Sequence, residues 1–166
     1  MENYIKQAKQ IIEENIYMVI SSASLDGRPW ISPVFFAYDN SYNFFWVSNK
    51  DSRHSALIRS NPHVAIVIFD SRAPQGKGDG VYFEAKIDEL SEKSDIAHAM
   101  EILSARVTID EFRIKKIEEV MGGGVWRVYR ANPIKIYKLA EGTHINGQYV
   151  DTKVEIELVE KSNEHK

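Results

Sequence analysis

The sequence contains no cysteine, which excludes disulfide bonds and cysteine catalysis and fits a reducing compartment. It has no apolar run long enough to span a bilayer and no basic start followed by an apolar stretch, so we expect neither a membrane segment nor a signal peptide. A large charge of one sign is also missing. The net charge is −3, which gives no global attraction to nucleic acid. We therefore expect a cytoplasmic protein with no nucleic-acid and no membrane partner.

The chain does have the length and the apolar content of a folded domain. Its 166 residues are 43% hydrophobic and 27% charged, which is ordinary for a globular protein. A chain of this length buries about 70% of its unfolded surface, so it needs neither disulfides nor a metal to fold. No internal repeat and no low-complexity linker divides it. We predict one domain over residues 1–158, followed by a charged, frayed tail over residues 159–166.

Hydrophobic spacing and capping signals predict four helices. Within the first, Ile5, Ala8 and Ile12 fall on one face. The second is ended by the pair Asn61-Pro62, because proline disfavours a helical residue before it. The fourth has Thr108 and Glu111 at capping-box spacing and ends at three glycines. The predicted ranges are residues 2–15, 52–60, 92–106 and 110–121.

Short apolar segments between turn residues predict strands. Asp26-Gly27 and Asn146-Gly147 supply the turn chemistry of hairpins, and consecutive hairpins favour an antiparallel sheet. Asn132-Pro133 is expected to separate two strands, and residues 71–80 are expected to form a loop, a candidate lid. The predicted ranges are residues 17–20, 29–38, 43–48, 63–70, 81–90, 125–130, 134–139 and 149–158. Short strands interrupted by helices indicate a mainly β chain with α insertions, folded as a barrel.

The segment from Ser48 to His54 carries the clearest chemical signal. Hydroxyl, ammonium and guanidinium groups are packed into a few residues between a strand and a short helix. A helix N-terminus presents unpaired backbone N–H groups and a partial positive charge, so this combination suits a phosphate group. The alternative from local chemistry is a helix N-cap formed by Asp51 or Ser52, with solvated neighbours.

The residues around this segment are similar to a known cofactor-binding core. The strand residues 27–36, the strand ending Phe44-Phe45-Trp46-Val47-Ser48 and the closing Asn61-Pro62 resemble, in order and spacing, the pyridoxamine 5′-phosphate oxidase-like family. The resemblance covers residues 13–90 well and residues 125–139 more loosely. It implies an antiparallel six-stranded split β-barrel, the FMN-binding split barrel, flanked by helices.

The resemblance implies FMN as the cofactor and assigns its contacts. Ser52 and Arg53 match the family's phosphate-binding pair, and Ser48 matches its strand-end hydroxyl. A further strand matches the one whose backbone lies along the flavin ring, where an open strand edge offers alternating donors and acceptors. Trp126 is expected to line the apolar slot for the ring, with ordinary barrel core as the alternative for the aromatics. The predicted cofactor-binding residues are Ser32, Pro33, Val34, Phe35, Val47, Ser48, Lys50, Ser52, Arg53, His54 and Trp126.

Three positions depart from the family pattern. His54 stands where the family's triplet ends in lysine, which leaves more of the phosphate contact to Arg53 and Lys50. Gly80 stands where pyridoxamine oxidases carry a flavin-contacting glutamine. Residues 125–130 lack the Gly-Gly-aromatic-Arg pattern whose arginine meets the substrate. We therefore expect a protein that is not an efficient pyridoxamine phosphate oxidase.

The function predicted from these residues is an FMN-binding oxidoreductase with an unknown small-molecule redox partner. The flavin performs the redox chemistry, so no catalytic side chain is assigned. A homodimer is expected, because a barrel of this size cannot bury all its large apolar side chains. The alternatives are a non-catalytic flavin-binding, stress or sensor protein, or a deazaflavin- or haem-binding relative, in which His54, His63 or His144 would serve as the haem ligand. No two histidines have metal-ligand spacing, so no metal is predicted.

Overall fold

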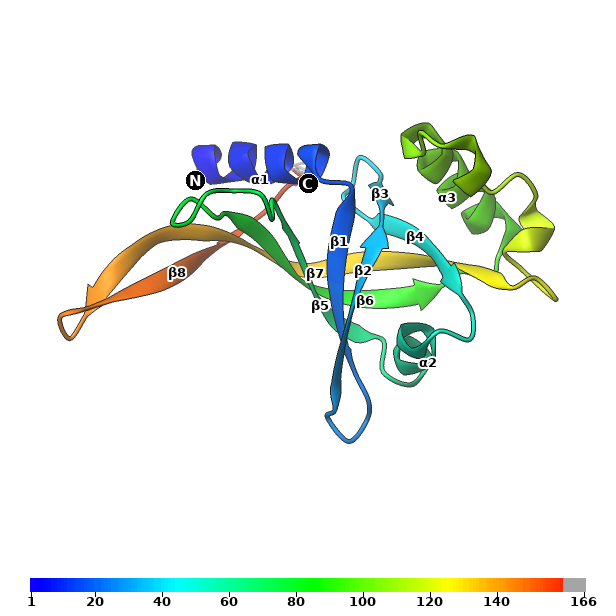
Figure 1. Ribbon diagram of the computed structural model, residues 1–166, viewed down its shortest axis with the longest axis horizontal. Coiled ribbons are helices and arrows are strands. Elements are labelled where there is room, and N and C mark those ends of the chain that lie inside the picture. Colours follow the sequence, from blue (N-terminus) through cyan, green and yellow to red (C-terminus); the bar gives the residue numbers. More distant parts are fainter. Residues whose placement is uncertain (160–166) are drawn as a thin grey trace, which may run out of the picture.

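An eight-stranded antiparallel sheet organises residues 1–159, which are the residues that the computed structural model describes (Figure 1). The strands are β1 (Tyr17–Ala23), β2 (Pro29–Phe35), β3 (Ala37–Tyr38), β4 (Phe44–Asn49), β5 (His63–Phe69), β6 (Gly80–Glu89), β7 (Trp126–Ile145) and β8 (Gln148–Ile156). The helices are α1 (Glu2–Glu14), α2 (Arg53–Ser60) and α3 (Lys93–Arg106), with short 3-10 turns η1 (Asp110–Phe112) and η2 (Ile117–Glu119). The predicted tail lies outside the described residues from residue 160 onward.

The strand order is β2-β1-β5-β6-β7-β4-β3, and β8 pairs with the far part of β7. Every pairing is antiparallel. The mainly β, split-barrel class predicted from the sequence is confirmed, with eight strands instead of six. Within the described residues the sheet does not close, because β2 and β3 stand at its two ends.

Both faces of the sheet are covered, and β4 shows how the sequence achieves this. Successive strand residues point to opposite faces. Phe44 and Trp46 therefore join the core cluster beneath α1, whereas Phe45 joins the cluster that α3 covers. This explains why β4 reads as a continuous apolar run and not as an alternating one.

The last predicted helix, over residues 110–121, is wrong. The segment forms η1 and η2 separated by extended residues. Arg113 donates hydrogen bonds to the carbonyl oxygens of Ser104 and Val107, which fixes the segment against the end of α3 in a non-helical path. The predicted cap paired Thr108 with Glu111. The cap that forms instead joins the Lys116 N–H to the carboxylate of Glu119, three residues further along the chain, at 2.9 Å.

Two strand boundaries also differ from the prediction. Asn132-Pro133 does not end a strand, because β7 runs through it as one strand of 20 residues. Proline lacks the N–H that a sheet needs, and a register shift opposite Glu84 and Ala85 accommodates it. The single strand predicted over residues 29–38 divides at Phe36 into β2 and β3, which pair with different neighbours.

Arg106, in the last turn of α3, fastens α1 to the sheet. Its guanidinium donates to the carbonyl oxygens of Ile12, Glu13 and Asn15 at the end of α1, at 3.1, 3.0 and 2.6 Å. A fourth bond goes to the carbonyl of Phe36 at 3.2 Å, and the guanidinium lies 4.4 Å from the centre of the Phe36 ring. One side chain therefore satisfies carbonyl groups that a helix end leaves without partners.

The loop between β5 and β6 lies at the opposite end of β5 from α2, since α2 leads into the start of that strand. Asp79, near the end of this loop, pairs with the Nζ of Lys138, whose side chain is 1% exposed.

No helix in residues 1–159 has the length and apolar character needed to cross a membrane.

Candidate functional site

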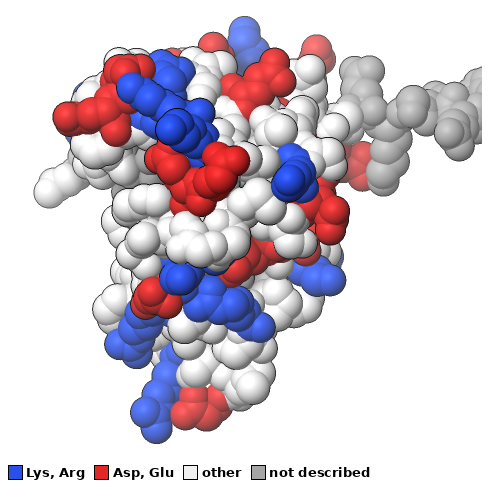
Figure 2. Space-filling view, turned by 90° about the vertical axis from the view of Figure 1, so that its right-hand side faces the viewer, with Lys and Arg blue, Asp and Glu red and all other residues white. Residues whose placement is uncertain are grey.

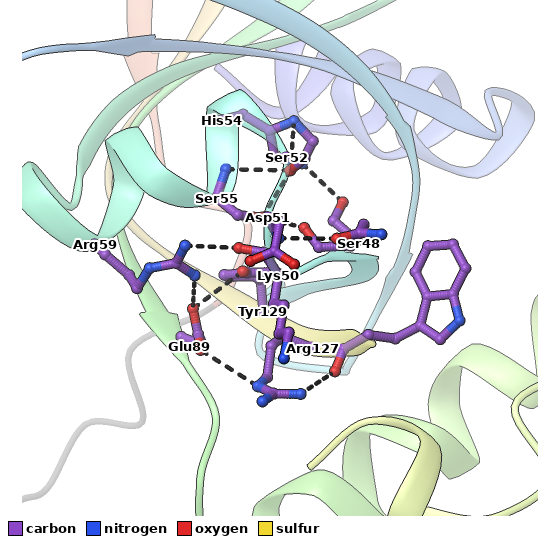
Figure 3. Close-up of polar contacts among 12 residues, drawn as sticks. Ser48, Lys50, Asp51, Ser52, His54, Ser55, Arg59, Glu89, Arg127 and Tyr129 are labelled. Carbon is purple, nitrogen blue, oxygen red and sulfur yellow. Dashed lines mark hydrogen bonds and ion pairs between the residues drawn. The ribbon is translucent and has the colours of Figure 1, made fainter. Parts of the chain in front are cut away.

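The predicted phosphate-binding residues gather where β4 ends and α2 begins (Figure 3). Asn49 shapes the turn between the two elements: its side-chain oxygen accepts from the Asp51 N–H at 2.8 Å and its carbonyl accepts from the Ser52 N–H at 3.1 Å. Ser52 caps α2 by accepting from the Ser55 N–H at 3.4 Å. The capping alternative is therefore correct for Ser52, and the same hydroxyl also belongs to a polar cluster. We call Ser48, Ser52, Arg53 and His54 the cradle.

His54 joins the two serines of the cradle. Its Nε2 lies 2.8 Å from the Ser48 Oγ and 3.2 Å from the Ser52 Oγ. Figure 3 shows the three side chains pointing toward one another. Burial lowers the pKa of His54, because desolvation disfavours the charged imidazolium. The imidazole is therefore neutral near pH 7 in the structure, and either ring nitrogen can carry its proton.

Arg53 lies on the exposed side of the cradle, at the junction of α2 with β2. Its guanidinium lies 4.1 Å from the centre of the Trp30 ring, within the range of a cation–π contact. Trp30 itself is 38% exposed. Figure 2 shows Lys and Arg side chains interspersed with Asp and Glu on the lower half of the face that it draws. The positive charge of the cradle itself comes from Arg53, which is an exposed residue.

Glu89, at the end of β6, links α2 to β7 beneath the cradle (Figure 3). Its Oε2 accepts from Arg59 at 2.9 Å and from the Tyr129 hydroxyl at 3.0 Å, while its Oε1 lies 3.7 Å from the Nε of Arg127. Arg59 also donates to the carbonyl of Lys50 at 2.6 Å. Burial, with the nearby charge of Glu89 adding to it, raises the pKa of Tyr129 to about 12, so its hydroxyl stays a donor.

Sequence reasoning missed this network. Arg59 and Glu89 are 30 positions apart, and Glu89 and Tyr129 are 40 apart. Glu89 and Tyr129 meet because β6 pairs with β7 in a register that places them opposite each other, and α2 brings Arg59 to Glu89. No local motif marks them. Both carboxylate oxygens of Glu89 face donors.

The predicted ring-contact residues lie on two other surfaces. Ser32 to Phe35 belong to β2, which pairs with β1 and has no second partner strand among residues 1–159. Its outer edge therefore presents open backbone groups, as the prediction requires. Phe35, Val47 and Trp126 line an apolar cavity of about 460 Å³ against α3.

Of the remaining candidates, His63 and His144 lie away from the cradle, whereas Lys50 stands in the turn between Ser48 and Ser52. Lys50 follows β4, and its N–H donates to the carbonyl of Val125 at 3.0 Å. His63 is exposed at the start of β5, and His144 lies on the β7–β8 hairpin against the Tyr149 ring. Figure 1 shows this hairpin at the other end of the molecule from α2. Residues 1–159 contain no group of three His, Asp or Glu side chains that could hold a metal ion.

A family model described as pyridoxamine 5′-phosphate oxidase matches residues 5–131. No curated protein matches the chain. Solved structures share the fold at low identity. The haem storage protein HutZ from Vibrio cholerae is 18% identical with a TM-score of 0.61, covering 75% of this chain and 86% of that chain.

Two further structures extend this comparison. A haem-binding protein from Mycobacterium smegmatis is 13% identical with a TM-score of 0.66, covering 90% of this chain and 57% of that chain. An FAD-binding protein from Mesorhizobium loti is 18% identical with a TM-score of 0.58, covering 79% and 90%. Identities this low establish the fold alone.

Proposed function

Because the chain belongs to the pyridoxamine 5′-phosphate oxidase family, we propose that it binds FMN and acts as a flavin-dependent oxidoreductase. The flavin phosphate is bound at the cradle, and the ring lies between the open edge of β2 and the apolar residues Phe35, Val47 and Trp126. FMN supplies the hydride and electron chemistry. The chain's own residues bind the cofactor, orient it and keep water from the ring.

The donor set at the start of α2 carries this proposal. A phosphate needs several donors and positive charge, and the cradle offers two hydroxyl groups, an imidazole and a guanidinium beside the first turn of a helix. Arg53 is held over Trp30 on the exposed side, so it can close on a phosphate without leaving α2. Glu89 does not oppose the anion, since its charge is shared with Arg59 and Arg127.

The network around Glu89 supports the cradle indirectly. Arg59 holds the carbonyl of Lys50, the residue that leads from β4 into the turn. The N–H of Lys50 is held from the other side by the carbonyl of Val125. The turn before α2 is therefore fixed through both backbone polar groups of Lys50. A preformed cradle loses little conformational freedom on binding, which favours affinity.

We also propose a homodimer. Large apolar side chains remain exposed around the ring-contact region in the single chain, and burying them against a second copy would remove them from water. They include Ile16, Tyr17, Phe112, Val125 and Trp126. Light scattering at micromolar concentration should give twice the chain mass of 19.0 kDa. A mass near that of one chain with FMN bound would contradict the dimer.

A comparison of FMN with riboflavin tests the phosphate assignment, because the two share the ring and differ in the phosphate. We expect the native protein to prefer FMN, and Arg53→Ala to weaken FMN binding about tenfold or more while leaving riboflavin affinity unchanged. Arg72→Ala is the matched control, since Arg72 is an exposed arginine paired with Asp70 in the β5–β6 loop. Equal affinities for FMN and riboflavin in the native protein would contradict the cradle assignment.

Haem is the second candidate ligand, because two of the similar solved structures are haem proteins. Haem needs an axial ligand, and His54 would have to give up its contacts with Ser48 and Ser52 to serve. The absorption spectrum of the purified protein separates the candidates. Flavin bands support FMN, whereas a Soret band that survives in a His54→Gln variant would indicate haem held by another histidine.

A further inference from the structure

The β7–β8 hairpin carries the sheet beyond the rest of the molecule and ends it with an open edge (Figure 1). β8 pairs with β7, and it has no second strand partner among residues 1–159. The two extra residues at the register shift, Glu141 and Gly142, belong to β7, so β8 itself is continuous. Its outer edge therefore presents a row of backbone N–H and C=O groups that can pair with another extended chain.

Two opposite charges lie close together on this edge strand. Asp151 and Lys153 are both exposed, and their spacing of two places them on the same face of β8. Neither side chain takes part in an ion pair within residues 1–159, and Lys153 lies 4.6 Å from the centre of the Tyr82 ring. A lone lysine on an edge strand discourages pairing with other chains. The aspartate beside it changes this, because a second copy of β8 brings the opposite charge to each of them.

One antiparallel register makes β8 complementary to itself. With the two-fold axis at Thr152, Asp151 of each copy lies opposite Lys153 of the other. On the other face of the strand, Val150 lies opposite Val154. Opposite-charge pairs and β-branched pairs directly across two strands are stabilising, whereas like charges are destabilising. Moving the axis by one residue in either direction sets two aspartates or two lysines against each other, so the sequence favours the register centred on Thr152.

We propose that the open edge of β8 pairs with β8 of a second copy of this chain, antiparallel and centred on Thr152. This surface is separate from the cradle and from the apolar residues of the proposed homodimer, so the inference does not depend on flavin binding. It joins homodimers into larger assemblies through a second two-fold contact. One strand pair buries little surface, so the association is weak and depends on concentration. We expect two chains at micromolar concentration and a higher mass in the millimolar range.

Single cysteines test the register, because the chain has no cysteine of its own. Thr152→Cys should form disulfide-linked pairs under mild oxidation, since the central residue faces its own copy with Cβ atoms about 4.5–5.5 Å apart. Val150→Cys is the control. Val150 is on the same face and is more exposed than Thr152, at 39%, but its two copies would lie four positions apart, about 13 Å. Denaturing gels without reductant should show Thr152→Cys linking at least about tenfold faster than Val150→Cys.

A charge exchange in the Thr152→Cys protein tests the side-chain pairs. Asp151→Lys and Lys153→Asp each set like charges against each other twice in the symmetric contact, so each should slow the linking about tenfold. Combining both substitutions restores opposite charges across the strands and should restore the rate. A purely local effect of the substitutions on the hairpin would not be reversed by the second change.

Each outcome supports or overturns the pairing. Equal linking of Thr152→Cys and Val150→Cys would indicate random collision and overturns it, as does a double charge exchange that fails to recover the rate. Folded Thr152→Cys protein that stays unlinked also overturns it and leaves the edge of β8 to an extended segment of a different protein. Sedimentation of the native chain needs no variant to fold, and a mass that never exceeds two chains up to millimolar concentration would refute the second contact.

Discussion

Replacing Arg106 by methionine should destabilise the fold strongly. The substitution keeps an unbranched stem against Phe36 but removes donors from four backbone carbonyl groups. A hydrogen bond from a charged donor contributes about 1.5–3 kcal/mol, and water can replace part of it at a half-buried site. We therefore expect the free energy of unfolding to fall by about 3–4 kcal/mol in total, including a small cation–π term.

Urea denaturation followed by circular dichroism measures this loss directly. For a chain of this size, the expected loss corresponds to a melting temperature lower by about 10 °C. Arg72→Met is the control, because its salt bridge with Asp70 is exposed and should contribute almost nothing. If Arg106→Met lost less than about 1 kcal/mol, then α1 would be held by its apolar face and not by this guanidinium.

Three further predictions concern the site. Trp30→Leu should weaken FMN binding about two- to fivefold, because it removes the ring that orients Arg53, and it should leave riboflavin affinity unchanged. An equal loss of affinity for both flavins would instead place Trp30 against the flavin ring. FMN affinity should rise as the pH falls below 7, because burial lowers the pKa of His54 in the free protein whereas a bound phosphate favours the imidazolium. Fluorescence titration across pH measures this, and the pH dependence of FMN affinity should flatten in His54→Gln. Turnover of pyridoxamine phosphate should stay below about 1 per second in an oxygen electrode, because Arg127 is engaged by Glu89 and Arg130 by Asp88; faster turnover would mean that one of them is released for a second phosphate.

Much of the fold was predictable because its signals are local. The face of α1, the cap at Ser52 and the Asn146-Gly147 turn each depend on residues a few positions apart, and all three appear in the structure. Both residues of that last turn have positive φ, at 53° and 79°, which is what a tight hairpin requires.

The errors arose where distant contacts override local preference. Residues 110–121 have helical signals, but Arg113 makes its bonds to the end of α3. Pro133 was expected to end a strand, but the pairing register of β6 with β7 shifts opposite it, and β7 continues. Of the candidate site, the cradle was predictable because Ser48, Ser52 and His54 are close in sequence, whereas Glu89 and Tyr129 meet only through strand pairing.

The pairing of β4 with β7 has a consequence for the order in which the molecule folds. The strand that ends in the cradle pairs with the short β3 just before it, but its second partner, β7, comes about eighty residues later, and the Lys50 N–H finds its acceptor only when Val125 is in place. Contacts of such long separation form slowly, since the intervening chain must be ordered first. On the ribosome, the first half of the chain therefore lacks the strand that fixes the turn of the cradle. Cofactor capture should follow folding of the sheet and cannot serve as its nucleus.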